Sequence, residues 1–172
     1  MMTNEQKQAA AESIRSFRLP RYHEIPDVGL YLEQTTKYIA GYLSPVLEGG
    51  LTASMISNYV KKDLIANPVK KQYSREQIAY LFFIAVAKQV LNLDALTGFI
   101  RLQQRTYDLE KAYNYFVSEF ENLLLFTFEL KDSAEAVGED NSDEKRLLFS
   151  CIAAVTQKIY LEKCLVTISE TE

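Results

Sequence analysis

The residues best suited to chemistry lie between Leu51 and Leu91, where polar side chains recur at helical spacing. A helix predicted there, Ala53–Lys62, carries an outer row at i, i+3, i+4 and i+7, consisting of Ser54, Ser57, Asn58 and Lys61. Hydroxyl and amide groups in such a row can hydrogen-bond to base edges, because the major groove of DNA admits one α-helix. The row therefore predicts that this helix reads DNA bases.

Further polar and basic side chains surround that row. We expect them to contact phosphates, which position a protein on DNA without reading its sequence. The predicted N-cap Thr52 leaves backbone N–H groups that can bind phosphate as well. The side chains expected around the row are Lys62, Lys70, Lys71, Tyr73 and Arg75. For Tyr73 the alternative is packing beneath the loop that carries it.

Charge is unevenly divided along this 172-residue chain, whose formal charge is −4. Residues 50–105 hold 8 basic and 3 acidic side chains, whereas residues 106–172 hold 6 basic and 14 acidic ones. A basic middle in an acidic protein indicates a polyanionic partner, most simply double-stranded DNA. The alternative is that the lysines form an ordinary solvated rim.

The sequence gives little support to catalysis or metal binding. The single histidine, His23, lies between prolines, and we expect it on the surface or in loop packing. Cys151 and Cys164 lie 13 residues apart on one predicted helix, ~220° around its axis, so they cannot chelate one metal from that helix. No glycine-rich phosphate loop is present. We therefore predict no enzyme activity, no catalytic residue, no cofactor and no metal site.

A helical framework is expected to position these residues. Six Gly and four Pro favour helices over a turn-rich β fold, and an apolar content of 48% supports a sizeable core. Besides Ala53–Lys62, helices are predicted over Val28–Leu43 (capped by Asp27), from Ser74 to Leu91 with a capping box to Gln77, over Leu93–Gln104 (capped by Asn92), over 107–131 and over about 143–167. The segment Val69–Tyr73 predicts a small β wing or hairpin.

The expected fold class is all-α, organised as an N-terminal arm (1–26), a helix-turn-helix domain (27–105) and a C-terminal helical hairpin (106–172). An antiparallel arrangement is the simplest one for the last two helices. They complete the core, supply a dimer interface, or do both. The N-terminus has no signal-peptide core and no window approaches 18 apolar residues, so we expect a cytoplasmic protein without a membrane span.

The stretch SMISNYVKKDLIANPVKKQYSREQIAYLFFI resembles the DNA-binding half of MerR-type regulators. The matching positions are Tyr59, Leu64-Ile65, Pro68 and Tyr73-Ser74. The resemblance implies a winged helix-turn-helix with Ala53–Lys62 as recognition helix, adds Tyr59 to the expected DNA contacts, and implies transcriptional regulation by a homodimer. The full chain is also similar to a group of uncharacterised bacterial proteins known only as a domain of unknown function and thought to carry this winged helix.

The chain departs from the MerR pattern at several positions. Ser57 stands where the pattern has Arg, and Asn58 stands where it has an aromatic residue. Asp63 replaces a Gly that would supply a left-handed turn, a conformation that Asp can also adopt. The loop from Pro68 to Tyr73 is short and lacks the wing Arg. The resemblance carries over no effector.

Two further hypotheses accompany DNA binding. The first is a protein-interaction adaptor on a helix-turn-helix scaffold that no longer binds DNA, as the absent Arg positions and the acidic total would allow. The second is small-molecule sensing in an aromatic pocket lined by residues such as Tyr113 and Phe116. Rings at that spacing are more often part of a core.

Overall fold

Helices make up nearly all of the regular structure, which confirms the expected all-α class. The computed structural model describes residues 2–135, 137 and 141–170. These residues form α1 (Asn4–Glu12), the 3-10 helix η1 (Tyr22–Glu24), β1 (Leu30–Tyr31), α2 (Leu32–Leu43), α3 (Ala53–Lys61), β2 (Gln72–Tyr73), α4 (Arg75–Ala87), α5 (Leu93–Thr106), α6 (Leu109–Thr127) and α7 (Asp143–Ser169). The strands form one two-stranded sheet.

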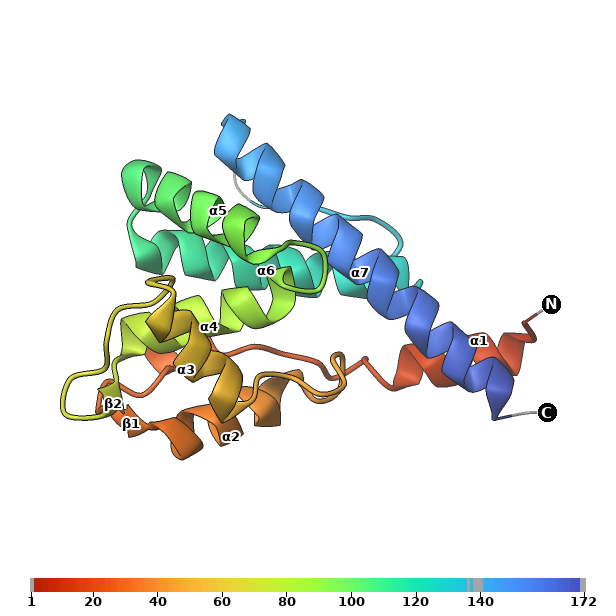
Figure 1. Cartoon of the computed structure of the whole chain (residues 1–172). Helices are drawn as coiled ribbons and strands as arrows, with labels where there is room; N and C mark the ends of the chain where they lie inside the picture. Colours follow the sequence, from red (N-terminus) through yellow and green to blue (C-terminus); the bar gives the residue numbers. More distant parts are fainter. Residues whose placement is uncertain (1, 136, 138–140, 171–172) are drawn as a thin grey trace.

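Helix α4 is the centre of the fold. Eight of its residues are buried, around most of its circumference, and it lies between α2 on one side and α6 with α7 on the other (Figure 1). Phe82 packs edge-on against Tyr38 and Tyr42 of α2, with ring centroids 5.9 Å apart in both pairs. The predicted capping box is present, since Ser74 and Gln77 exchange side-chain to backbone hydrogen bonds.

The helix predicted over Val28–Leu43 begins later, at Leu32, because the preceding backbone pairs as a strand. β1 runs antiparallel to β2, with Leu30 opposite Tyr73 and Tyr31 opposite Gln72. A Cβ atom on Gly29 would lie 2.6 Å from the Cβ of Gln72, so the close approach of the two segments requires glycine. The cap is therefore at Tyr31, whose N–H donates to the Gln34 side chain, and not at Asp27.

The prediction of an antiparallel C-terminal hairpin is wrong, since α6 and α7 run side by side in the same direction (Figure 1). Tyr107, just before α6, bonds to Ser142, the N-cap of α7, with 2.9 Å between their hydroxyl oxygens. At the other end of α6, the Phe128 ring packs 5.1 Å from that of Tyr160. The part of the connection at Glu135 lies beside α6, since the Asn122 amide donates to the Glu135 carbonyl. Short helical hairpins are antiparallel, but this connection is long enough to bring the chain back.

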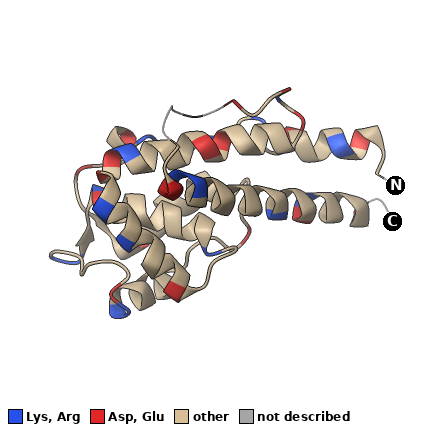
Figure 2. Cartoon of the chain, turned by 90° about the horizontal axis from the view of Figure 1, so that it is seen from above, with Lys and Arg blue, Asp and Glu red and all other residues tan. Residues whose placement is uncertain are grey.

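The predicted N-terminal arm packs against the C-terminal helices. Helix α1 lies beside the C-terminal half of α7, which extends away from the body of the protein (Figures 1 and 2). The following segment crosses α6, where Leu19 and Ile25 are fully buried. The Tyr113 hydroxyl donates to the Pro20 carbonyl (3.0 Å), and the Tyr22 N–H donates to the Asn114 side chain (2.8 Å). These contacts make the segment part of the core.

Candidate nucleic-acid interface

Helix α3 has the two faces that its sequence predicts. Its N-cap Thr52 accepts a hydrogen bond from the Met55 N–H (3.2 Å). Ile56 is fully buried against the core, while Ser54 and Asn58 are exposed. The other two members of the outer row are Ser57, which is half-buried, and Lys61, which is exposed. The polar row therefore faces outward on a helix whose opposite side is anchored.

Asp63 ends α3 with a left-handed turn. Its φ is +54°, and the Leu64 N–H donates to the Tyr59 carbonyl (2.9 Å) while the Asp63 N–H donates to the Val60 carbonyl (3.1 Å). This pair of bonds is the Schellman arrangement that usually has glycine at the left-handed position. The expectation that Asp63 adopts the left-handed conformation is confirmed, and the turn directs Leu64 and Ile65 into the core.

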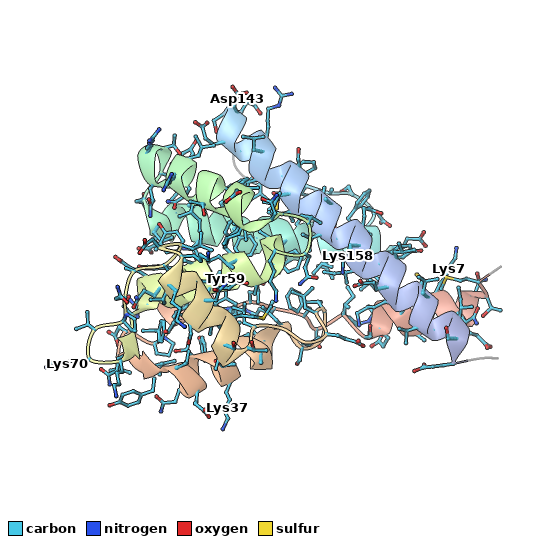
Figure 3. The ribbon with its side chains drawn as sticks, in the orientation of Figure 1. Lys7, Lys37, Tyr59, Lys70, Asp143 and Lys158 are labelled. Atoms are coloured by element: carbon cyan, nitrogen blue, oxygen red, sulfur yellow. The ribbon has the colours of Figure 1, made fainter. Side chains whose placement is uncertain are left out.

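The loop between α3 and α4 closes in a tight hairpin turn with lysines at both central positions. Lys70 and Lys71 have φ values of +50° and +64°, and the Gln72 N–H donates to the Val69 carbonyl (2.9 Å). This is the geometry of a type I′ turn, which favours Asn and Gly because both central residues are left-handed. The predicted hairpin is present, and Figure 3 shows Lys70 at the tip of the loop, pointing away from the body.

Four cations border the outer face of α3 and the hairpin turn, namely Lys61, Lys62, Lys70 and Lys71. All four are exposed, and in the part of the chain that the structure describes none of them forms an ion pair. Figure 2 shows the basic hairpin loop projecting from one side of the molecule. The one acidic side chain next to them along the chain is Asp63, also exposed. The surface therefore offers uncompensated positive charge to a polyanion.

Three of the residues expected to contact DNA instead pack or hydrogen-bond within the fold. Tyr59 and Tyr73 are 7% and 4% exposed, and burial raises the pKa of both phenols, so they are packing residues. The Arg75 side chain turns toward the N-terminal segment, where its Nε donates to the Ile25 carbonyl (2.8 Å) and its guanidinium lies 5.7 Å from the ring centre of Tyr22. The expectation that Arg75 meets phosphate is therefore corrected, because the buried carbonyl of Ile25 needs a donor.

Lys88 is a second basic residue with a structural role. Its ammonium donates to the Gly50 carbonyl (2.7 Å) and so ties the end of α4 to the connection that precedes α3. Burial lowers the pKa of Lys88. Part of the positive charge in residues 50–105 thus holds the fold together. The exposed cations of this range are the four lysines around α3 and the hairpin and, on α5, Arg101 and Arg105.

Neither β1 nor the left-handed conformation of the two lysines was predicted from the sequence. Tyr31 continues the helical periodicity that begins at Val28, so only Gly29 marks the strand. Lys-Lys is not a preferred pair for a type I′ turn. The hairpin itself could be predicted from the sequence, because a loop that begins with Pro and ends with Gln-Tyr-Ser connects two helices.

A comparison with protein-family models matches residues 20–116 to the family described as "Domain of unknown function (DUF1836)". That range is more than half of the chain. The chain belongs to the DUF1836 family. The DUF1836 range starts where the N-terminal segment crosses α6, contains the hairpin and α2 to α5, and ends within α6. Neither the curated proteins nor the solved structures gave a significant match.

Chemistry other than binding has few candidates in the described residues. Within residues 2–135, 137 and 141–170, no group of three or more His, Cys, Asp or Glu side chains could hold a metal ion. Cys151 and Cys164 are both buried, and burial raises the pKa of the Cys151 thiol to about 11. His23 is exposed within η1. Among the described helices, none combines the length and hydropathy needed to cross a lipid bilayer.

Proposed function

We propose that this protein is a transcriptional regulator that binds double-stranded DNA through a MerR-like winged helix-turn-helix. In this proposal α3 is the recognition helix, and the hairpin from Val69 to Gln72 is the wing. The order of elements supports it, since β1, α2, α3, the hairpin and α4 follow one another with β1 paired to the strand after the wing. The protein has no catalytic role in this proposal.

The observation that carries the proposal is the pair of left-handed lysines at the exposed tip of the wing. Left-handed φ values cost a non-glycine residue about 1–3 kcal/mol, and such residues cluster at functional sites. Lys70 and Lys71 give the turn no folding advantage over Asn-Gly, which would form it without strain. A phosphate backbone against the wing accounts for both the residue type and the position.

The experiment that tests the proposal is recovery and sequencing of genomic DNA fragments bound to the purified protein. A titration of the recovered fragment should then weaken steeply with salt, by a slope of about −0.9 in log K per log salt for each phosphate contact. Asn58→Ala should change the recovered sequence, because Asn suits adenine. No enrichment of fragments, or binding that does not respond to salt, would contradict DNA binding.

A protein-interaction adaptor is the second candidate, and the exposed carboxylate of Asp63 at the end of α3 favours it. That charge opposes the approach of phosphate, and Arg75 is engaged elsewhere. A partner protein that co-purifies with the chain, without DNA enrichment, would support the adaptor. Loss of that partner on Asn58→Ala would place its contact on the same face of α3.

A second copy of the chain is the partner that a helix-turn-helix regulator needs, because dimers bind two half-sites. The dimer interface was expected in residues 107–168. Within that range α6 is committed to the core, with Phe116, Val117 and Phe120 nearly fully buried. The available apolar surface is on the outer side of α7, where Leu161 and Leu165 are 58% and 54% exposed. We therefore place the proposed homodimer contact on this part of α7.

A further inference from the structure

A cavity of about 340 Å³ lies between α5, α6 and the first two turns of α7. That volume is within the range of small-molecule sites. A smaller cavity of about 50 Å³ shares four wall residues with it and continues it toward α4, where Tyr113 and Phe116 contribute to the lining. Figure 3 shows Asp143, the first residue of α7, at this end of the molecule and Lys7 of α1 far from it.

The walls of the larger cavity are mostly apolar. Phe99 and Leu102 of α5, Ala112 of α6 and Leu148 of α7 contribute side chains without a polar atom, and the rings of two tyrosines complete the walls. Apolar atoms that face unfilled space lack contact partners, which costs stability. A ligand of matching shape would supply those contacts.

The uncharged polar groups of the walls are already engaged within the protein. The Gln103 amide accepts from the Tyr80 hydroxyl (3.0 Å) and donates to the Tyr107 carbonyl (2.8 Å). The Thr106 hydroxyl donates to a carbonyl one turn earlier in α5 (3.0 Å), and the Tyr107 hydroxyl bonds to that of Ser142. A ligand that depends on hydrogen bonds would have to share or break these bonds, so apolar contact is the main attraction that the cavity offers.

The charged side chains give the opening no excess of either sign. The Lys145 ammonium lies 5.2 Å from the ring centre of Tyr115, and its charge acts on the buried Glu119, where it opposes the effect of burial on the pKa of that carboxyl. Among the described residues that line the cavity, the other charged ones are Lys111 and Glu144. Their charges are opposite, so neither an anion nor a cation gains from the field at the opening.

We infer that this cavity binds a small uncharged aromatic molecule. The ring of the ligand would lie against Phe99, Leu148 and the tyrosine rings, which offer edge-on and offset-stacked contacts. Apolar cavities of this kind take up uncharged aromatic molecules such as benzene. An ionised ligand would lose hydration without meeting an uncompensated charge of opposite sign. The inference adds a ligand site to the protein and does not depend on DNA binding.

The test is a fluorescence titration with 1-methylnaphthalene, 1-naphthoate and 1-naphthylmethylammonium, which share one ring system and differ in charge. The chain has no Trp, whose emission would overlap with that of naphthalene. We expect 1-methylnaphthalene to bind and each ion to bind at least about fivefold more weakly, because burial of an ion is costly. Hexane, in competition with 1-methylnaphthalene, should bind at least about threefold more weakly, since it makes no ring contacts.

Variants of Ala112 place the ligand in the cavity. Ala112→Phe fills the space that both cavities share and should abolish binding of 1-methylnaphthalene. Ala112→Leu fills less of it and should weaken binding, which keeps this part of the test open if the larger residue prevents folding. The matched control is Ala9→Phe, which adds the same ring at an exposed position of α1 and should leave binding unchanged.

Circular dichroism shows which variants fold, and the comparison of ligands on the unaltered protein needs no variant. Failure of 1-methylnaphthalene to bind would overturn the inference, as would equal or tighter binding of either ion. Equal binding of hexane would overturn the assignment to an aromatic ligand. Unchanged affinity in a folded Ala112 variant would overturn the placement in this cavity. No DNA is present in these measurements, so their failure is distinct from failure of the proposed function.

Discussion

Arg21 and Glu121, one hundred residues apart in the sequence, form a two-point ion pair that fastens the N-terminal segment to α6. Its two hydrogen bonds measure 2.9 and 2.8 Å, and the same carboxylate accepts from the Leu19 N–H at 2.9 Å. The side chains are 30% and 16% exposed, so water screens the pair only in part. The bond to Glu121 raises the pKa of the Arg21 guanidinium.

The first prediction concerns this pair. Glu121→Gln should lower the free energy of unfolding by about 1–3 kcal/mol, because a partly buried cation and a backbone donor lose a charged acceptor. Urea denaturation measures the change. The matched control is Arg18→Gln, which breaks the more exposed pair with Glu24 and should lower the free energy of unfolding by less, because solvent screens that pair. Equal losses in the two variants would show that the Arg21–Glu121 pair is no stronger than a surface contact.

The second prediction concerns the left-handed turn after α3. Asp63→Gly should raise the free energy of unfolding by about 0.5–1 kcal/mol, since glycine adopts positive φ without steric cost. Asp63→Ala should lower it, because alanine lacks the short polar side chain that tolerates this conformation. Thermal unfolding of the two variants should therefore move in opposite directions. If the DNA proposal is right, Asp63→Gly should also strengthen DNA binding by removing a negative charge.

The third prediction separates stability from binding at the wing. Lys70→Asn combined with Lys71→Gly should raise the melting temperature, because Asn-Gly is the preferred pair for this turn. The same variant should bind DNA more weakly and with a salt slope reduced by about two, one for each lost phosphate contact. Lys7→Gln with Arg15→Gln removes the same charge at the distant α1 end and should leave DNA binding unchanged. An unaltered salt slope in the wing variant would argue against phosphate contact there.

The fourth prediction is a pH dependence centred on Glu119 of α6. Glu119 is only 3% exposed. Among the described residues, no group donates a hydrogen bond to its Oε2 atom. Burial raises the pKa of Glu119 above its usual value near 4.5, against the opposing effects of Lys145 and a hydrogen bond from Tyr115. The folded state therefore holds this proton more tightly than the unfolded state, and stability is lost as pH rises above about 4.5 toward the folded pKa.

Glu119→Gln should remove this loss. The melting temperature of the variant minus that of the wild type should increase from pH 4.5 to pH 7, whatever this difference is at pH 4.5. Glu110→Gln, at the exposed start of α6, serves as the control and should show no such trend. Parallel pH profiles for Glu119→Gln and the wild type would mean that the buried carboxylate has no raised pKa.

The fifth prediction concerns the proposed homodimer. Leu161→Glu with Leu165→Glu should convert the dimer to a monomer in analytical ultracentrifugation, because charged groups at an apolar interface are costly to bury. Both side chains are exposed in the single chain, so the fold itself should be retained. A protein that is monomeric before substitution, or a dimer that survives it, would remove α7 as the interface.

Much of the fold follows from local sequence. A polar residue marks the start of three helices, since Thr52, Ser74 and Asn92 all cap their helices as predicted. Periodic apolar residues identify the buried face of α3 and the buried circumference of α4. Helix starts are local because a cap and the N–H groups that it satisfies lie within one turn. The polar row of α3 is visible for the same reason.

Contacts between distant segments decided the rest. The sequence by itself determined an all-α chain with an amphipathic α3, a buried α4 and a hairpin of lysines between them. Only the tertiary structure decided that α6 and α7 run in the same direction, that Arg75 serves Ile25 rather than a phosphate, and that a cavity opens beside Lys111 and Lys145. The direction of a helix, the acceptor that a side-chain donor finds and the position of a cavity all depend on which distant segments come into contact. Composition and periodicity describe local sequence and do not specify those contacts.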